Sequence, residues 1–281
     1  MLRLSKPFRH IIILFITISA GITNSDAQEA DSYNRILSQL DERPNFTAFK
    51  DNFGTIGTTI GHRATSTNSD SKYQLSIMER FTDSKLIWDT HFFFQFTMVS
   101  YLNVFEPSFP LHDISVNPGF GLGKHLIRDG KHIGYGYLMI EHESNGFDGE
   151  GEKSRSWNKI ALAATMRVTP NVELQFKGWY PIIDGRYSQH ILRYQGLFFV
   201  ASILSTNDKR LNLSTMLTPT YRKRIGINSQ FELNYKLMKD RPVFVIAQYH
   251  NGYGENLLDY NIYKSRLRVG FTIKPDGFYI F

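Results

Sequence analysis

The sequence predicts an all-β protein, a transmembrane antiparallel β-barrel of about twelve strands. Polar and apolar residues alternate along stretches of roughly 9 to 11 residues, which is the length of a membrane-spanning strand. Aromatic residues make up 14% of the chain, yet the mean hydropathy is negative, −0.28. That combination is expected when only one face of each strand is apolar. Short and long connections also alternate along the chain, as they do at the two rims of an outer-membrane barrel.

The N-terminus predicts export from the cytoplasm. Three basic residues, Arg3, Lys6 and Arg9, precede an apolar stretch over residues 11–22, and Ala27 closes a small-residue cleavage site. The chain has no cysteine, so an exported fold of this kind has no disulfide to stabilise it. The net charge of +6 comes without a Lys/Arg stripe interleaved with aromatics, which argues against nucleic acid as a partner.

Three regions follow from these signals. We expect residues 1–27 to be a signal peptide, residues 28–45 to be an N-terminal periplasmic segment, and residues 46–281 to form the barrel domain. Within the periplasmic segment, apolar residues recur at helical spacing, which predicts a small docking helix. These residues are Tyr33, Ile36, Leu37 and Leu40.

The strand pattern is clearest in the second half of the chain. Residues 171–180 alternate between an apolar set that includes Leu174 and Phe176 and a polar set that includes Gln175 and Lys177. We expect comparable segments to begin near Phe53, Lys72, His91, Ile114, Gly134, Ser156, Asn171, Ile191, Leu211, Ile227, Pro242 and Lys264. The chain ends on Phe281, behind Phe278 and Tyr279, an aromatic ending common in exported barrels.

The connections divide into two kinds. Those after the fourth, sixth, eighth and tenth segments are tight and turn-like, and those after the fifth, seventh and eleventh are longer. We interpret the short ones as periplasmic turns and the long ones as extracellular loops. A soluble β-barrel or β-sandwich is the alternative, because it also alternates when one face packs on a core. It rarely needs so many long, aromatic-rich strands.

The stretch from Glu141 to Ile160 holds the most suggestive chemistry. His142 and Ser144 lie on one face of the fifth predicted strand with Leu138 and Ile140, and Asn158 shares the face of Ile160 in the sixth. The apolar neighbours mark this face as the lipid side. Polar groups facing hydrocarbon are costly unless they pair with one another.

The residue types give each member a role in ester hydrolysis. His142 would take the proton of Ser144, Asn158 would orient the imidazole, and Ser144 would attack an ester carbonyl. Because the three residues face lipid, the expected substrate is a lipid. Two alternatives stay open: a non-enzymatic outer-membrane pore or binding barrel, and a transporter of lipid or fatty acid.

The same residues resemble a known signature. The segment with His142, Ser144, Asn145 and Gly146, followed by Ser154-Arg155-Ser156-Trp157-Asn158, is similar to that of the outer membrane phospholipase A family. Residues 252–261 resemble that family's last long loop, and residues 72–76 its second strand. The resemblance covers roughly Asn45 to Phe281.

The resemblance implies a twelve-stranded outer-membrane barrel that hydrolyses acyl esters of phospholipids and lysophospholipids. It implies Ser144 as nucleophile, His142 as base and Asn158 as orienting residue, with the main-chain amide of Gly146 helping to bind the oxyanion. It also implies dependence on Ca²⁺, activity as a homodimer, and an active site toward the extracellular side.

Calcium ligands follow from the resemblance as well. They would include the carbonyl of Phe147 and the side-chain oxygen of Ser154, because Ca²⁺ prefers oxygen donors. The loop between Gly146 and Ser154 is two residues longer than the family pattern and adds the acids Asp148, Glu150 and Glu152. Where the family has a partner-subunit serine ligand, the best match gives Phe109 beside Ser108. Asp184 lies in the loop of a further acidic ligand but out of register.

Overall fold

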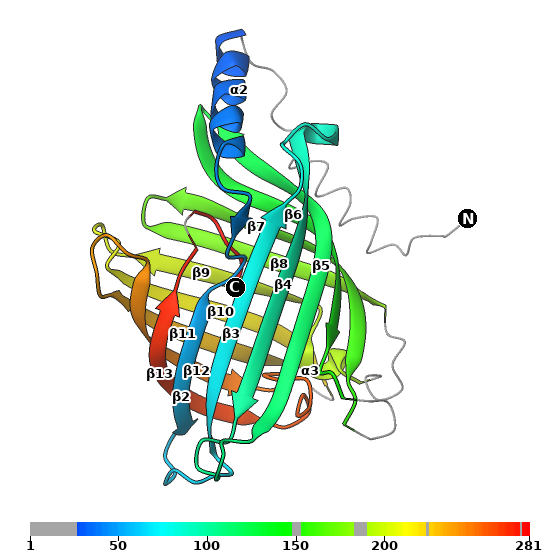
Figure 1. Ribbon diagram of the computed structural model, residues 1–281, viewed down its shortest axis with the longest axis vertical. Coiled ribbons are helices and arrows are strands. Elements are labelled where there is room, and N and C mark those ends of the chain that lie inside the picture. The colour runs from blue at the N-terminus through cyan, green and yellow to red at the C-terminus, as the bar shows by residue number, and fades with distance from the viewer. Residues whose placement is uncertain (1–26, 148–152, 183–189, 223–224, 276) are drawn as a thin grey trace.

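The protein is an antiparallel β-barrel, as a computed structural model of residues 27–147, 153–182, 190–222, 225–275 and 277–281 shows (Figure 1). A helix, α2 (Ala27–Asp41), and a two-residue strand, β1 (Phe46–Thr47), precede it. The barrel strands are β2 (Asn52–Thr59), β3 (Ser69–Arg80), β4 (Thr90–Leu102), β5 (Leu111–Arg128), β6 (Lys131–Ser144), β7 (Ser156–Thr169), β8 (Val172–Ile182), β9 (Phe198–Ser205), β10 (Leu211–Tyr221), β11 (Ile225–Lys236), β12 (Val243–Gly252) and β13 (Lys264–Ile273). Two short helices, η1 (Ile87–Asp89) and α3 (Leu192–Gln195), lie between strands.

Each barrel strand from β2 to β13 pairs with the next in sequence, and β13 pairs with β2 to close the ring. The strand β1 only extends β3, so the closed barrel has twelve strands, as the sequence predicts. No helix in the described part of the chain is long and apolar enough to cross a membrane.

One segment boundary in the prediction is wrong. We expected the eighth strand to begin near Ile191, but residues 192–195 form α3, and the strand begins at Phe198. Ile191 is buried with Trp157, Leu257 and Tyr260 in a small cluster. Ile191 is thus apolar because it packs in this cluster and not because it begins a strand, which explains the misplaced start. The predicted signal peptide lies almost entirely in residues 1–26, outside the described residues.

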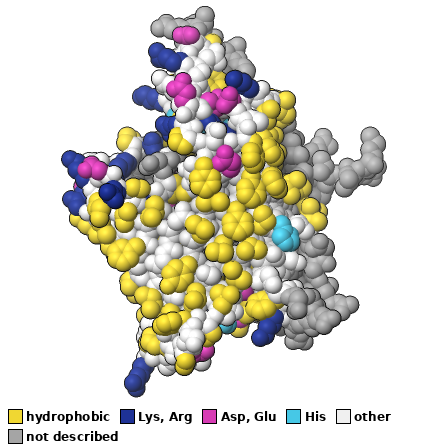
Figure 2. All heavy atoms as spheres, viewed as in Figure 1, with side chains coloured by type: hydrophobic (Ala, Val, Ile, Leu, Met, Phe, Trp, Pro, Cys, Tyr) yellow, Lys and Arg dark blue, Asp and Glu magenta, His cyan; other side chains and the backbone are white. Residues whose placement is uncertain are grey.

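The outer wall of the barrel is apolar. Along β8, Leu174, Phe176 and Tyr180 are exposed, whereas Gln175 and Lys177 between them are buried in the lumen. Hydrophobic side chains cover much of the wall in the view of Figure 2. The period-two pattern of the sequence therefore separates a lipid-facing surface from a polar interior.

An aromatic and aliphatic cluster fills part of the lumen. It includes Phe49, Phe93, Tyr137 and Ile280, all nearly inaccessible to solvent. The last residues of the chain belong to this cluster and do not extend β13, which ends at Ile273. Gln175 holds them, because its side-chain amide donates to the carbonyl of Tyr279 (2.9 Å) and accepts from the backbone N–H of Phe281 (3.0 Å).

The predicted docking helix is α2. Leu37 and Leu40 pack against Ile127 near the end of β5, and Arg80 of β3 forms an ion pair with Asp41 at 3.0 Å. Figure 1 shows α2 projecting beyond the barrel at the end where the β5–β6 hairpin turns. The helix is therefore tied to the rim that carries the short turns.

A buried charge network supports the opposite rim. Arg268 of β13 donates to Asp70 of β3 (2.6 Å) and to Glu255, which lies in the β12–β13 loop. Burial by itself would raise the pKa of Glu255, but Arg268, His250 and Lys72 hold it well below its usual value. Glu255 is thus ionised, and it joins the loop to the barrel wall.

Replacing Arg268 by Leu is expected to destabilise the barrel by about 3 kcal/mol, because it leaves buried carboxylates without their main partner. The loss of stability is no larger than this because Arg266 still contacts Asp70, and Lys72 lies 3.6 Å from Glu255. Heat-induced unfolding in detergent measures the change. Arg128→Leu, which removes an exposed arginine, is the matched control. Equal unfolding temperatures for both variants would contradict this prediction.

Candidate active site

The predicted catalytic residues lie on two adjacent strands. In the register of β6 and β7, His142 is opposite Asn158 and Ser144 is opposite Ser156. His142 is exposed on the outer wall, and its neighbours Glu141 and Glu143 point toward the lumen. The structure thus brings the histidine and the asparagine together on the face that the alternation predicts.

The two side chains are joined by a hydrogen bond. Nδ1 of His142 lies 2.9 Å from Oδ1 of Asn158. An amide oxygen can only accept, so Nδ1 is the donor, and in the neutral form of the ring Nε2 is the nitrogen with the free lone pair. This arrangement fixes both the tautomer and the ring orientation of the histidine. Ser144 follows two residues later on the same strand and the same face.

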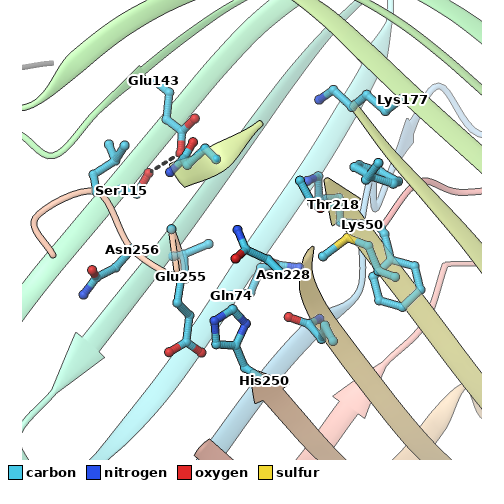
Figure 3. Close-up of a pocket in the computed structure, with 18 of the residues that line it drawn as sticks. Lys50, Gln74, Ser115, Glu143, Lys177, Thr218, Asn228, His250, Glu255 and Asn256 are labelled. Carbon is cyan, nitrogen blue, oxygen red and sulfur yellow. Dashed lines mark hydrogen bonds between the residues drawn. The ribbon is translucent and has the colours of Figure 1, made fainter. Parts of the chain in front are cut away.

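The inward neighbours of His142 hold β6 to the strands around it. Glu141 forms an ion pair with Lys177 of β8 (2.8 Å). Glu143 accepts hydrogen bonds from Lys159 (2.7 Å) and from Ser115 of β5 (3.1 Å), the latter drawn as a dashed line in Figure 3. These lumen contacts anchor the strand segment that presents the histidine and serine outside.

The loop after β6 is organised by Asn145, a residue of the family-like segment to which the sequence assigned no role. Asn145 is buried; its side chain donates to the carbonyl of Lys153 (2.8 Å) and accepts from the backbone N–H of Arg155 (2.9 Å). Gly146 follows with φ +70°, a conformation that favours glycine. The Asn-Gly pair, a common turn signal, was the available clue.

The loop also carries the two residues that the family resemblance assigns to calcium. Phe147 is exposed and Ser154 is half-buried. Among the described residues, no side-chain group of three or more His, Cys, Asp or Glu could hold a metal ion. A hydroxyl and a carbonyl at this place are nevertheless the oxygen donors that suit Ca²⁺. The added acids of residues 148–152 lie outside the described residues.

Two further positions bear on the calcium ligands. Ser108 and Phe109 lie in the β4–β5 loop, both with positive φ, 66° and 45°. Phe109 is exposed, and its side chain offers no ligand atom. Asp184 lies outside the described residues.

The lumen contains a cavity of about 260 Å³ with both polar and apolar lining residues (Figure 3). Residues of opposite charge line it, among them Lys50, Lys177, Glu143 and Glu255. None of the predicted catalytic residues does, because His142 and Asn158 point from the same strands to the other side of the wall. The candidate active site is therefore a feature of the outer surface.

Comparison with known proteins is consistent with this architecture. The solved structure of outer membrane phospholipase A from Escherichia coli superimposes with a TM-score of 0.70 at 21% identity, over 82% of this chain and 98% of that one. That of a Salmonella typhi outer membrane phospholipase dimer with bound calcium gives 0.72 at 20% identity, over 85% and 97%. These likenesses establish the fold, an outer-membrane β-barrel.

Sequence comparison establishes the family. Phospholipase A1 of Escherichia coli K12 is 27% identical over 173 residues, 60% of this chain and 56% of that protein. Phospholipase A1 of Klebsiella pneumoniae is 26% identical over 173 residues, 60% and 57%. The match thus spans little more than half the length of these curated relatives. The Phospholipase A1 family profile matches residues 25–273, and the chain therefore belongs to that family.

Proposed function

We propose that this protein is a calcium-dependent outer-membrane phospholipase that uses Ser144, His142 and Asn158 to hydrolyse acyl esters. The observation that carries the proposal is the hydrogen bond between His142 Nδ1 and Asn158 Oδ1, at 2.9 Å on the outer wall. It leaves Nε2 of the histidine able to accept a proton from a hydroxyl on the same face. Family membership supports the reaction type.

The chemistry follows the order of a serine hydrolase. His142 Nε2 accepts the hydroxyl proton as Ser144 Oγ attacks the ester carbonyl, and Asn158 keeps the imidazolium oriented. The proton then passes to the departing lysophospholipid or glycerol oxygen, which leaves an acyl-serine. Water, deprotonated by the same histidine, releases the fatty acid and restores Ser144.

The loop after β6 would stabilise the negative charge on the carbonyl oxygen. Gly146 adopts a positive φ, and no heavy atom of the described residues lies within 4 Å of the position where a Cβ would be. Its backbone N–H is the proposed oxyanion donor. Phe147 and Ser154 would hold Ca²⁺, which would add positive charge near the same oxygen.

The substrate class follows from the position of the site. His142 is exposed among apolar wall residues such as Leu138 and Ile140, which are also exposed. A water-soluble ester would gain little from such a surface, whereas the acyl chains of phospholipids and lysophospholipids pack against it. We propose that the active form is a homodimer with its sites toward the extracellular side. The solved Salmonella typhi relative is a dimer with bound calcium, which supports the oligomer and the metal.

Removal of calcium is expected to stop hydrolysis. Fatty-acid release from phospholipid in detergent micelles should fall to background in chelator and return when Ca²⁺ is supplied in excess. Mg²⁺ should not restore it, because Mg²⁺ demands a smaller octahedral site and releases its water reluctantly. Ser154→Ala should raise the half-saturating calcium concentration about 10-fold. Full activity in chelator would contradict calcium dependence.

The main alternative is a non-enzymatic pore or binding barrel. The cluster around Phe49, Tyr137 and Ile280 occupies part of the lumen, which does not favour a pore. Passage of lipid or fatty acid through the barrel meets the same obstruction. Reaction with a sulfonyl fluoride separates these functions, because a pore without an activated serine should not be labelled.

A further inference from the structure

The backbone of His142 is held in an unusual way. In the register of β5 and β6, Val116 is opposite Ser144 and Gly119 is opposite Glu141, which puts Pro118 across from His142. Proline has no N–H and cannot donate a ladder hydrogen bond. The carbonyl of His142 accepts instead from the side-chain amide of Asn117, with N···O 2.8 Å. A side chain thus replaces the missing backbone donor.

Asn117 is itself fixed on the lumen side. Its Oδ1 accepts from Nε2 of Gln95 on β4 (3.2 Å), and Oε1 of Gln95 accepts from the hydroxyl of Thr97 (3.2 Å). Thr97 in turn lies 2.7 Å from the hydroxyl of Ser76 on β3. Because Oδ1 is used by Gln95, the amide of Asn117 is oriented with Nδ2 toward His142. A chain of hydrogen bonds therefore runs from β3 through β4 and β5 to the histidine.

The neighbouring glycine makes room for this chain. A Cβ on Gly119 would lie 2.8 Å from Nε2 of Gln95, too close for the hydrogen bond to keep its geometry. Asn117 and Gln95 are both buried. The lumen side of the wall therefore has room for the hydrogen bonds that link Gln95, Asn117 and the carbonyl of His142.

The direction of the His142 carbonyl also affects the outer face. In an antiparallel strand, the N–H and C=O of one residue point to the same neighbour, so His142 is bonded toward β5. Its pairing with Asn158 on β7 is then of the type without backbone hydrogen bonds, in which side chains come closer. That spacing suits the hydrogen bond between the imidazole and the amide.

We infer that Asn117 is a positioning residue for the histidine of the hydrolase site, acting through the wall from the lumen. The inference rests on the proposed function, since it assigns Asn117 a part in the same reaction. Without its donor, the carbonyl of His142 is unpaired opposite Pro118, and β6 is free to shift at the residue that must align with Ser144 and Asn158. Small displacements of a catalytic group lower the rate strongly.

The test compares three variants and one control by two readouts, the kinetics of ester hydrolysis and the rate of Ser144 labelling. Asn117→Ala removes the donor, and Asn117→Asp keeps the size and polarity but replaces the donor with an acceptor. Both should lower kcat and the rate of Ser144 labelling by a sulfonyl fluoride about 10-fold, with KM within about twofold. The labelling rate reports the alignment of Ser144 and His142 without depending on lipid binding. Measurements are made well below the unfolding temperature of each variant.

The decisive variant adds Pro118→Ala to Asn117→Ala. Alanine restores a backbone N–H across from His142, so most of the lost labelling rate should return. Asn234→Ala is the matched control, because Asn234 is a buried lumen asparagine on β11 whose side chain makes no hydrogen bond to the described residues. It should leave both readouts unchanged.

The outcomes separate this inference from the proposed function. If the wild type is labelled at Ser144 but Asn117→Ala reacts as fast, Asn117 has no positioning role. The same holds if Pro118→Ala fails to rescue the loss. If the wild type is not labelled at all, the serine hydrolase itself is wrong, and the role of Asn117 is rejected with it.

Discussion

Replacing Ser144 by Ala is expected to lower kcat/KM for phospholipid hydrolysis by about 10⁴-fold or more. Alanine removes the nucleophilic oxygen, and the remaining residues cannot form an acyl-enzyme. The change removes only a hydroxyl at the end of β6, where the side chain is half-buried, so the barrel should fold as before. Initial rates of fatty-acid release in calcium-containing detergent micelles measure the effect.

A matched serine on the same surface provides the control. Ser202 on β9 is also half-buried on the outer wall, opposite Leu174 and Thr215, with no histidine opposite it on either neighbouring strand. Ser202→Ala should retain activity within about twofold, because it changes the wall without touching the site. Full hydrolysis by Ser144→Ala would mean that another residue is the nucleophile and that the proposed chemistry is wrong.

The faces of the strands were predictable from sequence because they depend on a local rule. Successive side chains of a strand alternate, so the exposed Ile140 and the buried Glu141 fix the direction of His142 once the strand is identified. The placement of His142 and Asn158 on neighbouring strands required only that consecutive strands pair, as they do in antiparallel barrels. These two facts were enough to predict that both side chains lie on the same face of adjacent strands, whereas their direct pairing also depends on the register.

Other features depend on contacts between distant residues and could not be predicted in this way. Gln175 of β8 holds the backbone at Tyr279 and Phe281, and alternation says nothing about such a contact. Ile191 looked like a strand start because it is apolar, but it is buried under loop residues from the other end of the chain, Leu257 and Tyr260. Tertiary burial there overrode the strand pattern.

Asn117 shows the limit most clearly within the site. In sequence it is one polar residue in an alternating strand, and its importance depends on the absence of a donor at Pro118 and on the register that sets Pro118 opposite His142. Register in a hairpin follows from its turn and from any bulge along its strands. In the β5–β6 hairpin an irregularity between Leu126 and Ile127 shifts the pairing by one residue, so the turn alone does not predict that Pro118 lies opposite His142. Because Asn117 contacts a backbone carbonyl, which every residue has, no sequence motif marks its role.

Replacing His142 by Ala is expected to reduce kcat/KM nearly as far as Ser144→Ala, because a serine without its base is a poor nucleophile at neutral pH. His112→Ala is the matched control. His112 is a partly exposed histidine at the loop end of β5, bonded to Asp259 at 2.7 Å, and its loss should change activity only a few-fold.

The double variant His142→Ala/Ser144→Ala gives the sharper result. When two residues act as a unit, the effects of replacing them are not additive. The double variant should therefore be no slower than Ser144→Ala alone. Were the two losses to multiply, His142 would be contributing to a step that does not involve the serine, such as binding lipid at the barrel wall. We expect no further loss of activity in the double variant if the imidazole of His142 acts only as the base for the hydroxyl of Ser144. The hydrogen bond from His142 to Asn158, which orients that imidazole, agrees with this role.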